Sequence, residues 1–162
     1  MSKITLGSPA RFVLEVTWEE PDQLLSSVTQ ICNGHFPCLS QVDQLDIYKA
    51  SDLELVGRNE AGPSHWLELL RPFSGVRSLY VCDELESLIA AALRELTGER
   101  MMEVLPVLEN LSLDELGRSG PARDAMEPFI AARQITDRPI VVQRQKKRYR
   151  SRTNSPYSSE DE

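Results

Sequence analysis

Residues 72–96 read PFSGVRSLYVCDELESLIAAALREL, and two hydrophobic periods follow one another within this stretch. After Val76, Leu79 and Val81 alternate with outward positions, which is typical of a strand with one buried face. Further along, apolar residues recur at the i, i+3, i+4 spacing of a single helix face. They are Leu85, Leu88, Ile89, Ala92, Leu93 and Leu96. We therefore predict a strand that leads directly into an amphipathic helix.

The ends of the predicted helix carry capping signals. Asp83 is a favourable N-cap residue, and Glu86 stands three residues later, where a capping box places its reciprocal partner. Gly98 follows the last apolar position and predicts the C-terminal stop. The helix is thus expected to have a defined start, one buried face and a defined end.

The strand phrase occurs three times in the chain. Its anchor residues are Leu39, Val42, Leu45 and Ile47, then Phe73, Val76, Leu79 and Val81, then Leu105, Leu108, Leu111 and Leu113. The copies are offset by 34 and 32 residues, a range in which one strand and one helix repeat as a unit. Three copies linked through helical patterns indicate repeated βα units and hence a parallel sheet.

Other segments extend this pattern along the chain. The predicted elements are a strand at 11–17, a helix from Pro21 to Cys32, a strand at 42–48, a loop over 49–63, a helix capped by Ser64 and closed by Pro72, a helical turn within 99–105, a strand at 108–113, a helix after Pro121 that Pro128 kinks, and a strand at 140–142. Turn residues, capping residues and proline positions set these bounds.

Composition narrows the class of protein. The chain has 162 residues and a formal net charge of −7, and the basic residues are concentrated after residue 143. An acidic body argues against nucleic acid as the main ligand, because phosphate contacts need folded basic surface. The sequence has no apolar run of the roughly 20 residues that span a bilayer and no signal peptide. With three cysteines in no regular framework, it predicts a cytoplasmic or nuclear protein that binds no membrane.

The sequence contains few motifs that indicate metal binding or catalysis. Cys32, His35 and Cys38 are close in sequence, but structural zinc needs four ligands and no second pair follows, so we predict no metal. His65 is expected to cap or pack. The chain has two histidines and neither a Gly-rich phosphate loop nor a G-x-S-x-G elbow, which argues against nucleotide or hydrolase chemistry. We expect no catalytic residues and no cofactor.

The C-terminal segment carries regulatory signals. Lys146, Lys147, Arg148 and Arg150 form a short basic run that predicts a nuclear localisation signal, with a plain solvated charge run as the alternative. Ser155, followed by proline, and Ser158 and Ser159, followed by acidic residues, are candidate phosphorylation sites. From residue 145 the segment is nearly free of aliphatic residues and is expected to be disordered.

Four phrases carry a resemblance to a known family: HWLELLRPFSGVRSLYV at 65–81, LIAAALREL at 88–96, EVLPVLENLSL at 103–113 and PFIAARQITDRPIVV at 128–142. Residues from about 36 to 144 resemble the C-terminal region of leucine-rich-repeat-like F-box proteins, abundant in mushroom-forming fungi. The resemblance implies a curved sheet lined by helices and a substrate-receptor role in a ubiquitin ligase. The F-box that docks the ligase adaptor is expected before such repeats and is absent here, so adaptor docking is not expected.

Together these signals predict an α/β fold, a short leucine-rich-repeat-like βα solenoid with a curved parallel sheet of about five strands and helices on its convex side. The expected domain organisation is a flexible N-terminus at 1–10, the repeat domain at 11–144 and the tail at 145–162. The strand at 11–17 is expected to be an open edge, which promotes association. No obligate oligomer is predicted.

In alternating strands the residues between the anchors point away from the core. On the concave side of a curved sheet this places Glu15 and Thr17, then Gln44, Asp46 and Tyr48, then Ser78, Tyr80 and Cys82, then Asn110, Ser112 and Asp114, then Val141 and Gln143. Tyrosines beside short polar and acidic residues suit a protein-binding face, and the plain alternative is a solvated sheet face. The predicted partner-binding residues are Glu15, Asp46, Tyr48, Ser78, Tyr80, Ser112 and Asp114.

The leading functional hypothesis is a non-enzymatic protein-interaction module of the substrate-receptor type that holds a protein partner on this face. One alternative is a small enzyme with a site in the 49–65 region near His65. Another is an inactive remnant of a longer protein.

Overall fold

The structure is a computed structural model that describes residues 3–7, 11–16, 30, 39–49, 62–114 and 121–145 of the chain. Short strands alternate with helices along most of this sequence. The elements are β1 (Lys3–Gly7), β2 (Arg11–Val16), the 3-10 helix η1 (Leu39–Gln41), β3 (Gln44–Lys49), α2 (Pro63–Leu70), β4 (Ser78–Val81), α3 (Asp83–Arg94), the 3-10 helix η2 (Gly98–Met102), β5 (Asn110–Asp114), α4 (Pro121–Ile135) and β6 (Val141–Gln145).

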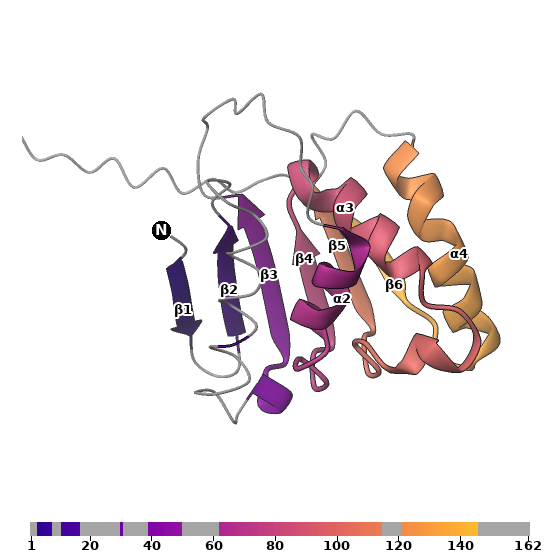
Figure 1. The fold of residues 1–162 in the computed structure, drawn as a ribbon, viewed down its shortest axis with the longest axis horizontal. Helices are drawn as coiled ribbons and strands as arrows, with labels where there is room; N and C mark the ends of the chain where they lie inside the picture. Colours follow the sequence, from indigo (N-terminus) through magenta and orange to yellow (C-terminus); the bar gives the residue numbers. More distant parts are fainter. Residues whose placement is uncertain are drawn as a thin grey trace, which may run out of the picture.

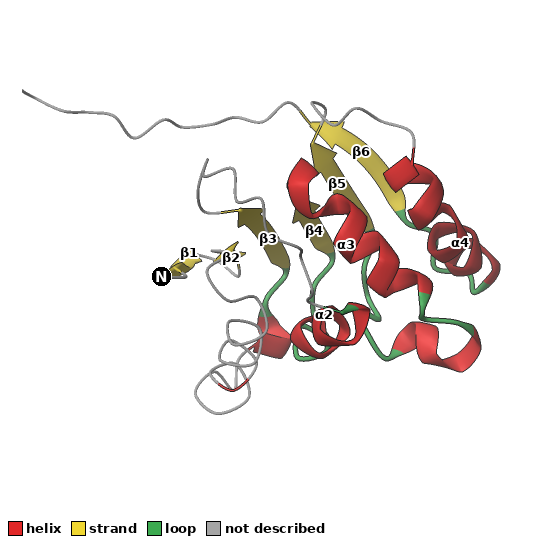
Figure 2. Cartoon of the chain, turned by 45° about the horizontal axis from the view of Figure 1, so that its top comes forward, coloured by secondary structure: helices red, strands yellow, loops and turns green. Residues whose placement is uncertain are grey.

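All the described strands join one sheet whose spatial order is the chain order, from β1 to β6. Strands β2 to β6 are parallel, and β1 runs antiparallel to β2 (Figure 1). Helices α2, α3 and α4 lie on the same side of the sheet (Figure 2). The fold is therefore α/β with five parallel strands, as the repeated strand phrase predicts.

The anchor residues of the three phrases lie in register. Leu45, Leu79 and Leu111 are direct neighbours on β3, β4 and β5, and Ile47, Val81 and Leu113 form the next row. All twelve anchors are buried. The prediction of the core from sequence is confirmed at each of these positions.

The same turn precedes each of the three central strands. In each copy the amide of the second anchor donates to the carbonyl of the first, at 3.1 to 3.3 Å, and the pairs are Leu39 with Val42, Phe73 with Val76, and Leu105 with Leu108. The turns also touch one another, because a Cβ built on Gly75 would overlap the carbonyl oxygen of Ser40. Only glycine lets these two turns approach so closely.

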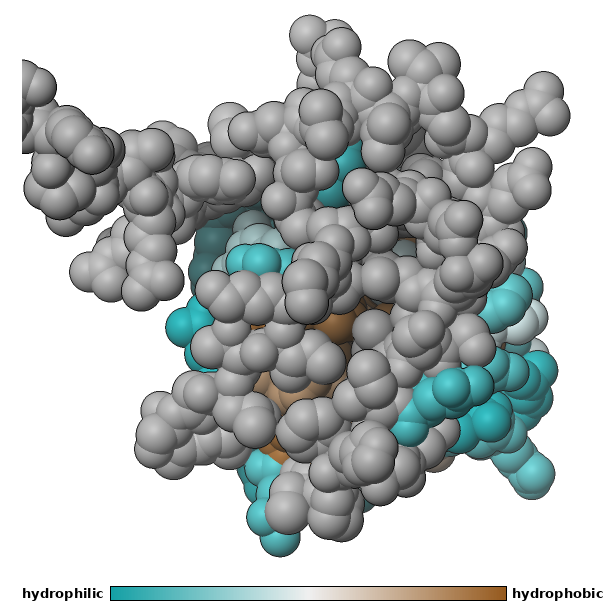
Figure 3. Space-filling view, turned by 60° about the vertical axis from the view of Figure 1, so that its left-hand side comes forward, coloured by the Kyte–Doolittle hydropathy of each residue, from teal (hydrophilic) through white to brown (hydrophobic). Residues whose placement is uncertain are grey.

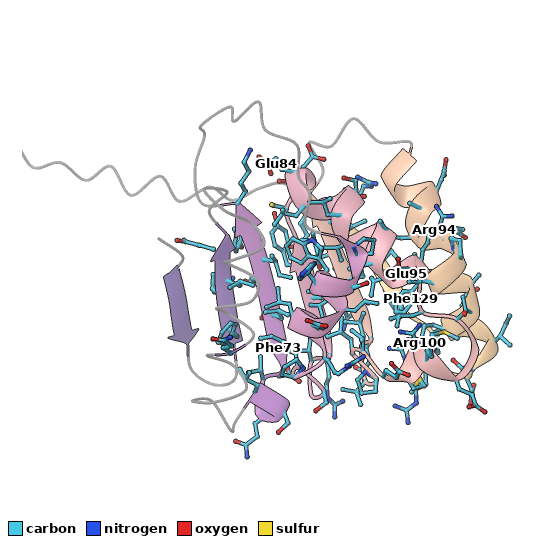
Figure 4. All side chains as sticks on the ribbon, viewed as in Figure 1. Phe73, Glu84, Arg94, Glu95, Arg100 and Phe129 are labelled. Atoms are coloured by element: carbon cyan, nitrogen blue, oxygen red, sulfur yellow. The ribbon has the colours of Figure 1, made fainter. Side chains whose placement is uncertain are left out.

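The core lies between the sheet and the helices. Phe12 of β2 packs edge to face against Phe73, with ring centroids 5.2 Å apart, at the end of the sheet where the parallel strands begin (Figure 4). Seen from the side of β1, hydrophobic atoms lie towards the middle of the described part and hydrophilic side chains lie at its rim (Figure 3). Trp66 of α2 is fully buried in the same cluster.

Helix α3 buries the predicted face but begins one residue earlier than predicted. Leu85, Ile89 and Leu93 are fully buried. Cys82 occupies the N-cap position and its side chain makes no capping hydrogen bond, so the prediction of Asp83 as N-cap and of a capping box with Glu86 is wrong. The amide of Cys82 donates to the carbonyl of Ile47 at 3.1 Å, which keeps this residue extended, and the helix begins directly after it at Asp83.

Two further helix ends differ from the sequence prediction. Helix α3 ends at Arg94, before the last predicted helical position, Leu96. Gly98, which was predicted to stop this helix, has a φ of 57° and begins η2. Helix α2 begins at Pro63 after Gly62 as N-cap, so Ser64 is inside the helix and does not cap it. Proline suits this first helical position, because an amide proton there would have no hydrogen-bond partner within the helix and its absence costs nothing.

Helix α4 and the strands at the two edges of the sheet agree with the sequence prediction only in part. The helix buries Met126, Phe129 and Ile130 as predicted, and Pro128 lies inside it. Strand β6 covers Val141–Gln145, three residues further than predicted. The prediction of an open edge at 11–17 is wrong, because β1 pairs with β2 and is itself the edge strand.

Candidate binding face of the sheet

The sheet face opposite the described helices is the candidate site, and we call it the open face. Its side chains form rows that run across the strands. The first row is Arg11, Gln44, Ser78, Asn110 and Val141, and the second is Val13, Asp46, Tyr80, Ser112 and Gln143. A third row begins with Glu15 and Tyr48 and resumes with Asp114 and Gln145. The structure thus brings together all seven of the predicted partner-binding residues.

Tyr48 and Tyr80 form the centre of this face. Their ring centroids are 5.1 Å apart and the rings are tilted by 36°. Both side chains are half-buried. Burial raises the pKa of both hydroxyls, and the charge of Asp46 raises that of Tyr48 while the charge of Asp114 raises that of Tyr80. The two phenols are therefore neutral at physiological pH and offer apolar ring area with a hydrogen-bonding tip.

Asp46 is buried beside the tyrosines and is fully engaged. The Nε of Arg11 donates to its Oδ2 at 2.7 Å, a second guanidinium nitrogen contacts the same oxygen, and Gln44 Nε2 donates to Oδ1 at 3.0 Å. Only 1% of Asp46 is exposed, which is unusual for an aspartate on an open sheet surface. The hydrogen bond to Asp46 raises the pKa of Arg11. This ion pair joins β2 to β3 and holds the two side chains in place on the open face.

Asp114 and Ser112 occupy the side of the face next to β6. Asp114 is 1% exposed, whereas Ser112 is half-buried and accepts a hydrogen bond from Gln145 Nε2 at 3.3 Å. The carbonyl oxygen of Asp114 accepts from Arg144 at 3.2 Å. Asp46 and Asp114 were expected to project into solvent, and the structure instead buries both carboxylates.

Behind this corner, on the helix side of the sheet, Arg144 also approaches α3. Its guanidinium lies 3.6 Å from a carboxylate oxygen of Glu86, whose side chain is 3% exposed. That oxygen has no hydrogen-bond partner among the described residues. Burial raises the pKa of Glu86, while the positive charge of Arg144 lowers it. The residue predicted to close a capping box is therefore a buried acid that links α3 to β6.

Cys82 follows β4 at the same end of the sheet. It is 1% exposed, and burial raises its pKa to about 11. The thiol is therefore protonated at physiological pH and is a weak nucleophile. It was expected in the outward row, and its burial removes it from the binding surface.

Several sequence predictions fall on residues that the structure does not describe. They are Thr17, the Cys32, His35 and Cys38 group, the 50–61 loop, the basic run of Lys146, Lys147, Arg148 and Arg150, and Ser155, Ser158 and Ser159. His65 lies in α2 as expected, and its Nδ1 is buried with no hydrogen-bond partner in the described part of the chain. In that part no three His, Cys, Asp or Glu side chains are placed to hold a metal ion.

Some residues of the site were not anticipated from the sequence. Arg11, the partner of Asp46, stands two positions before Val13, so strand alternation already places it on this face. Arg144 and Glu86 carry no such local signal, because their contact depends on how α3 packs over strands β3, β4 and β5. No helix in the described residues is long and apolar enough to cross a membrane.

Comparisons of this chain with models of protein families, with curated proteins and with solved structures give no match. Function is therefore inferred from the chain's own residues. The feature that they offer is a half-buried tyrosine pair on a sheet face that no described helix covers.

Proposed function

We propose that this chain is a non-enzymatic protein-interaction module that holds a partner protein on the open face. The observation that carries the proposal is the Tyr48–Tyr80 pair, with ring centroids 5.1 Å apart. The two rings are half-buried among short polar side chains on the side of the sheet away from the helices. Aromatic side chains supply large contact area at low entropic cost and dominate protein interfaces. Ser78 and Ser112, half-buried beside them, add hydrogen-bonding groups.

The finer architecture belongs to the same proposal. The repeated turns, the in-register anchors and the identity of chain order and sheet order support a short leucine-rich-repeat-like solenoid with the open face on its concave side. In such arrays each unit contacts its neighbours and the concave side binds ligands. The resemblance to the repeat region of F-box proteins fits a substrate-receptor role, with the partner as the captured protein.

The protonation states on the open face favour binding over catalysis. The hydroxyls of Tyr48 and Tyr80 and the thiol of Cys82 all have raised pKa values, and Asp46 is held by Arg11. A nucleophile or general base needs a group poised to lose or take a proton near neutral pH. These groups are neutral or paired instead. The strand order also runs without the reversal that creates the ligand crevice of doubly wound sheets.

The test compares partner capture by matched variants of the full chain. Tyr48→Ala combined with Tyr80→Ala removes the ring pair, and Arg94→Ala combined with Glu95→Ala alters two exposed residues on the helix side (Figure 4). Immobilised proteins are incubated with cell lysate, and bound proteins are quantified by mass spectrometry. We expect specific partners to fall about tenfold with the tyrosine variant, as for loss of an interface hot spot, and to be retained by the control.

Equal capture by the wild type and the tyrosine variant would remove the open face as the binding site. Recovery of a ligase adaptor with the wild type would support the substrate-receptor form of the proposal. Recovery of a specific partner with no adaptor would leave a stand-alone interaction module.

A further inference from the structure

The described side chains of the open face carry more negative than positive charge. Among its described side chains the charged groups are one arginine, Arg11, and three carboxylates, Glu15, Asp46 and Asp114. Two of the carboxylates are buried and engaged, but their charge still contributes to the potential above the face. Exposed acids at the start of α3 add to it, and Glu84 lies at the end of the sheet towards which the parallel strands point (Figure 4).

Strand β6 ends at this acidic end of the sheet. Its last residue, Gln145, is the register partner of Asp114, so the sequence after β6 is joined to the sheet next to this residue. They read KKRYR at 146–150 and include four cations and a tyrosine. The most basic stretch of the sequence therefore starts at the corner of the open face.

The basic stretch is long enough to cross the face. Neighbouring strands are about 4.8 Å apart, so the path from β6 to β3 is roughly 14 Å. Five extended residues span about 17 Å. Residues 146–150 can therefore pass over β5 and β4 and reach Tyr48 on β3.

The chemistry of the two surfaces is complementary. Guanidinium and ammonium groups bind to tyrosine rings, most favourably where water is partly excluded, and the half-buried Tyr48 and Tyr80 rings provide such a place. Arg144 lies on the helix side of this corner, where its guanidinium is 3.6 Å from a carboxylate oxygen of Glu86, so basic and acidic groups already meet at this end of β6. The next four cations follow within six residues of it.

We propose that the open face binds basic extended segments and that residues 146–150 of this chain are its intramolecular occupant. This inference rests on the proposed function and specifies the chemistry of the partner. A protein partner presents a comparable basic segment and must displace the chain's own. The tether places the internal segment at a local concentration of the millimolar order, so that weak intrinsic affinity suffices to keep the face occupied.

The experiment uses the full chain and a fluorescein-labelled peptide, QKKRYRS, which copies residues 145–151. Peptide binding is measured by fluorescence anisotropy for the wild type and for a chain in which Lys146, Lys147, Arg148 and Arg150 are all replaced by glutamine. We expect the neutralised chain to bind the peptide at least about tenfold more tightly, because its own segment no longer competes. A second chain carrying only Arg152→Gln is the control and should bind as the wild type does.

Two variants test the location on the neutralised chain. Tyr48→Ala with Tyr80→Ala should abolish peptide binding, and Ser112→Lys, which puts a cation beside Tyr80, should weaken it at least tenfold. The Ser112 variant decides the matter if the tyrosine variant does not fold by circular dichroism. A peptide with glutamine at the four basic positions should not bind.

Equal peptide binding by the wild-type and neutralised chains, no binding by the neutralised chain at millimolar peptide, or binding that survives the face variants would each overturn the inference. The readout needs no cellular partner, so it is separate from the capture test. If the peptide binds at the face but the tyrosine variant still captures the same proteins from lysate, the intramolecular contact of residues 146–150 would be upheld and the proposed function would be removed.

Discussion

At the scale of single residues, close backbone approach decides which side chains the repeated turns accept. Gly75 faces the carbonyl group of Ser40 in the preceding turn, with the carbonyl carbon 2.9 Å from the position of a Cβ. Gly62 has more space, since the nearest atom to its Cβ position is 4.0 Å away on His65. The two glycines therefore differ in what an added methyl group would meet.

We expect Gly75→Ala to lower the free energy of unfolding by about 3 kcal/mol, because backbone atoms of two turns must separate to admit the methyl group. Gly62→Ala is the control and should cost no more than about 1 kcal/mol, the cost of replacing a favourable N-cap residue by alanine. Urea unfolding followed by circular dichroism measures both. Similar losses for the two variants would mean that the close contact of the turns does not limit stability.

A second residue-scale prediction concerns Glu86. Burial raises its pKa, so the folded state keeps this proton at a pH where the unfolded chain, with a glutamate pKa near about 4.3, has lost it. Over that interval the folded state binds more protons, and its stability falls as pH rises. Glu86→Gln removes the titrating group. The variant should therefore gain stability relative to the wild type as the pH is raised from about 4.3 through the folded pKa.

Urea unfolding at a series of pH values checks this expectation. Glu68→Gln, which neutralises an exposed carboxylate on α2, provides the comparison. A stability difference between Glu86→Gln and the wild type that does not change with pH would contradict the expectation.

At the scale of elements, periodicity in the sequence identifies the strands and helices better than it identifies their ends. The alternation in 76–81 and the helical spacing in 85–96 are properties of the chain itself, so burial follows from them directly. The start of α3 depends on a sheet hydrogen bond between Cys82 and Ile47, a tertiary contact that no capping rule contains. Strand β1 was missed because Ile4 and Leu6 give only a short alternation before Pro9.

Arg133 attaches helix α4 to the loop that precedes β5. This arginine is fully buried and donates to the carbonyl oxygens of Leu105 and Pro106, and its guanidinium lies 5.5 Å from the ring centre of Phe129. Burial lowers its pKa. One side chain thus satisfies two carbonyl groups of the loop that leads into β5.

We expect Arg133→Ala to cost about 2 to 3 kcal/mol of unfolding free energy, because buried carbonyl groups lose a charged donor. Arg138→Ala should cost little, since Arg138 is exposed and reaches Pro106 only at 3.4 Å. Thermal and urea unfolding of the two variants give the comparison. An equal effect of both substitutions would show that the buried hydrogen bonds of Arg133 add no stability.

At the scale of the whole molecule, the sequence predicts which residues lie on the candidate site, but it does not predict which of their charged groups are buried and paired. Strand alternation places Tyr48, Tyr80 and Ser112 on one face, and a parallel sheet in chain order brings them together. Alternation states which way a side chain points but not how deeply it is covered. The burial of Asp46 depends on Arg11, 35 residues earlier, and such pairing requires the assembled sheet.

The agreement between chain order and sheet order has a consequence for how such a protein can change in length. Each inner strand has for its two neighbours the strands that come before and after it in the sequence. A tandem copy of one strand with its turn and helix, added in frame, would meet the same neighbours that its original meets. Lengthening by duplication, or shortening by loss of one such segment, therefore preserves the contacts of every other strand, which a sheet with interleaved strand order does not permit.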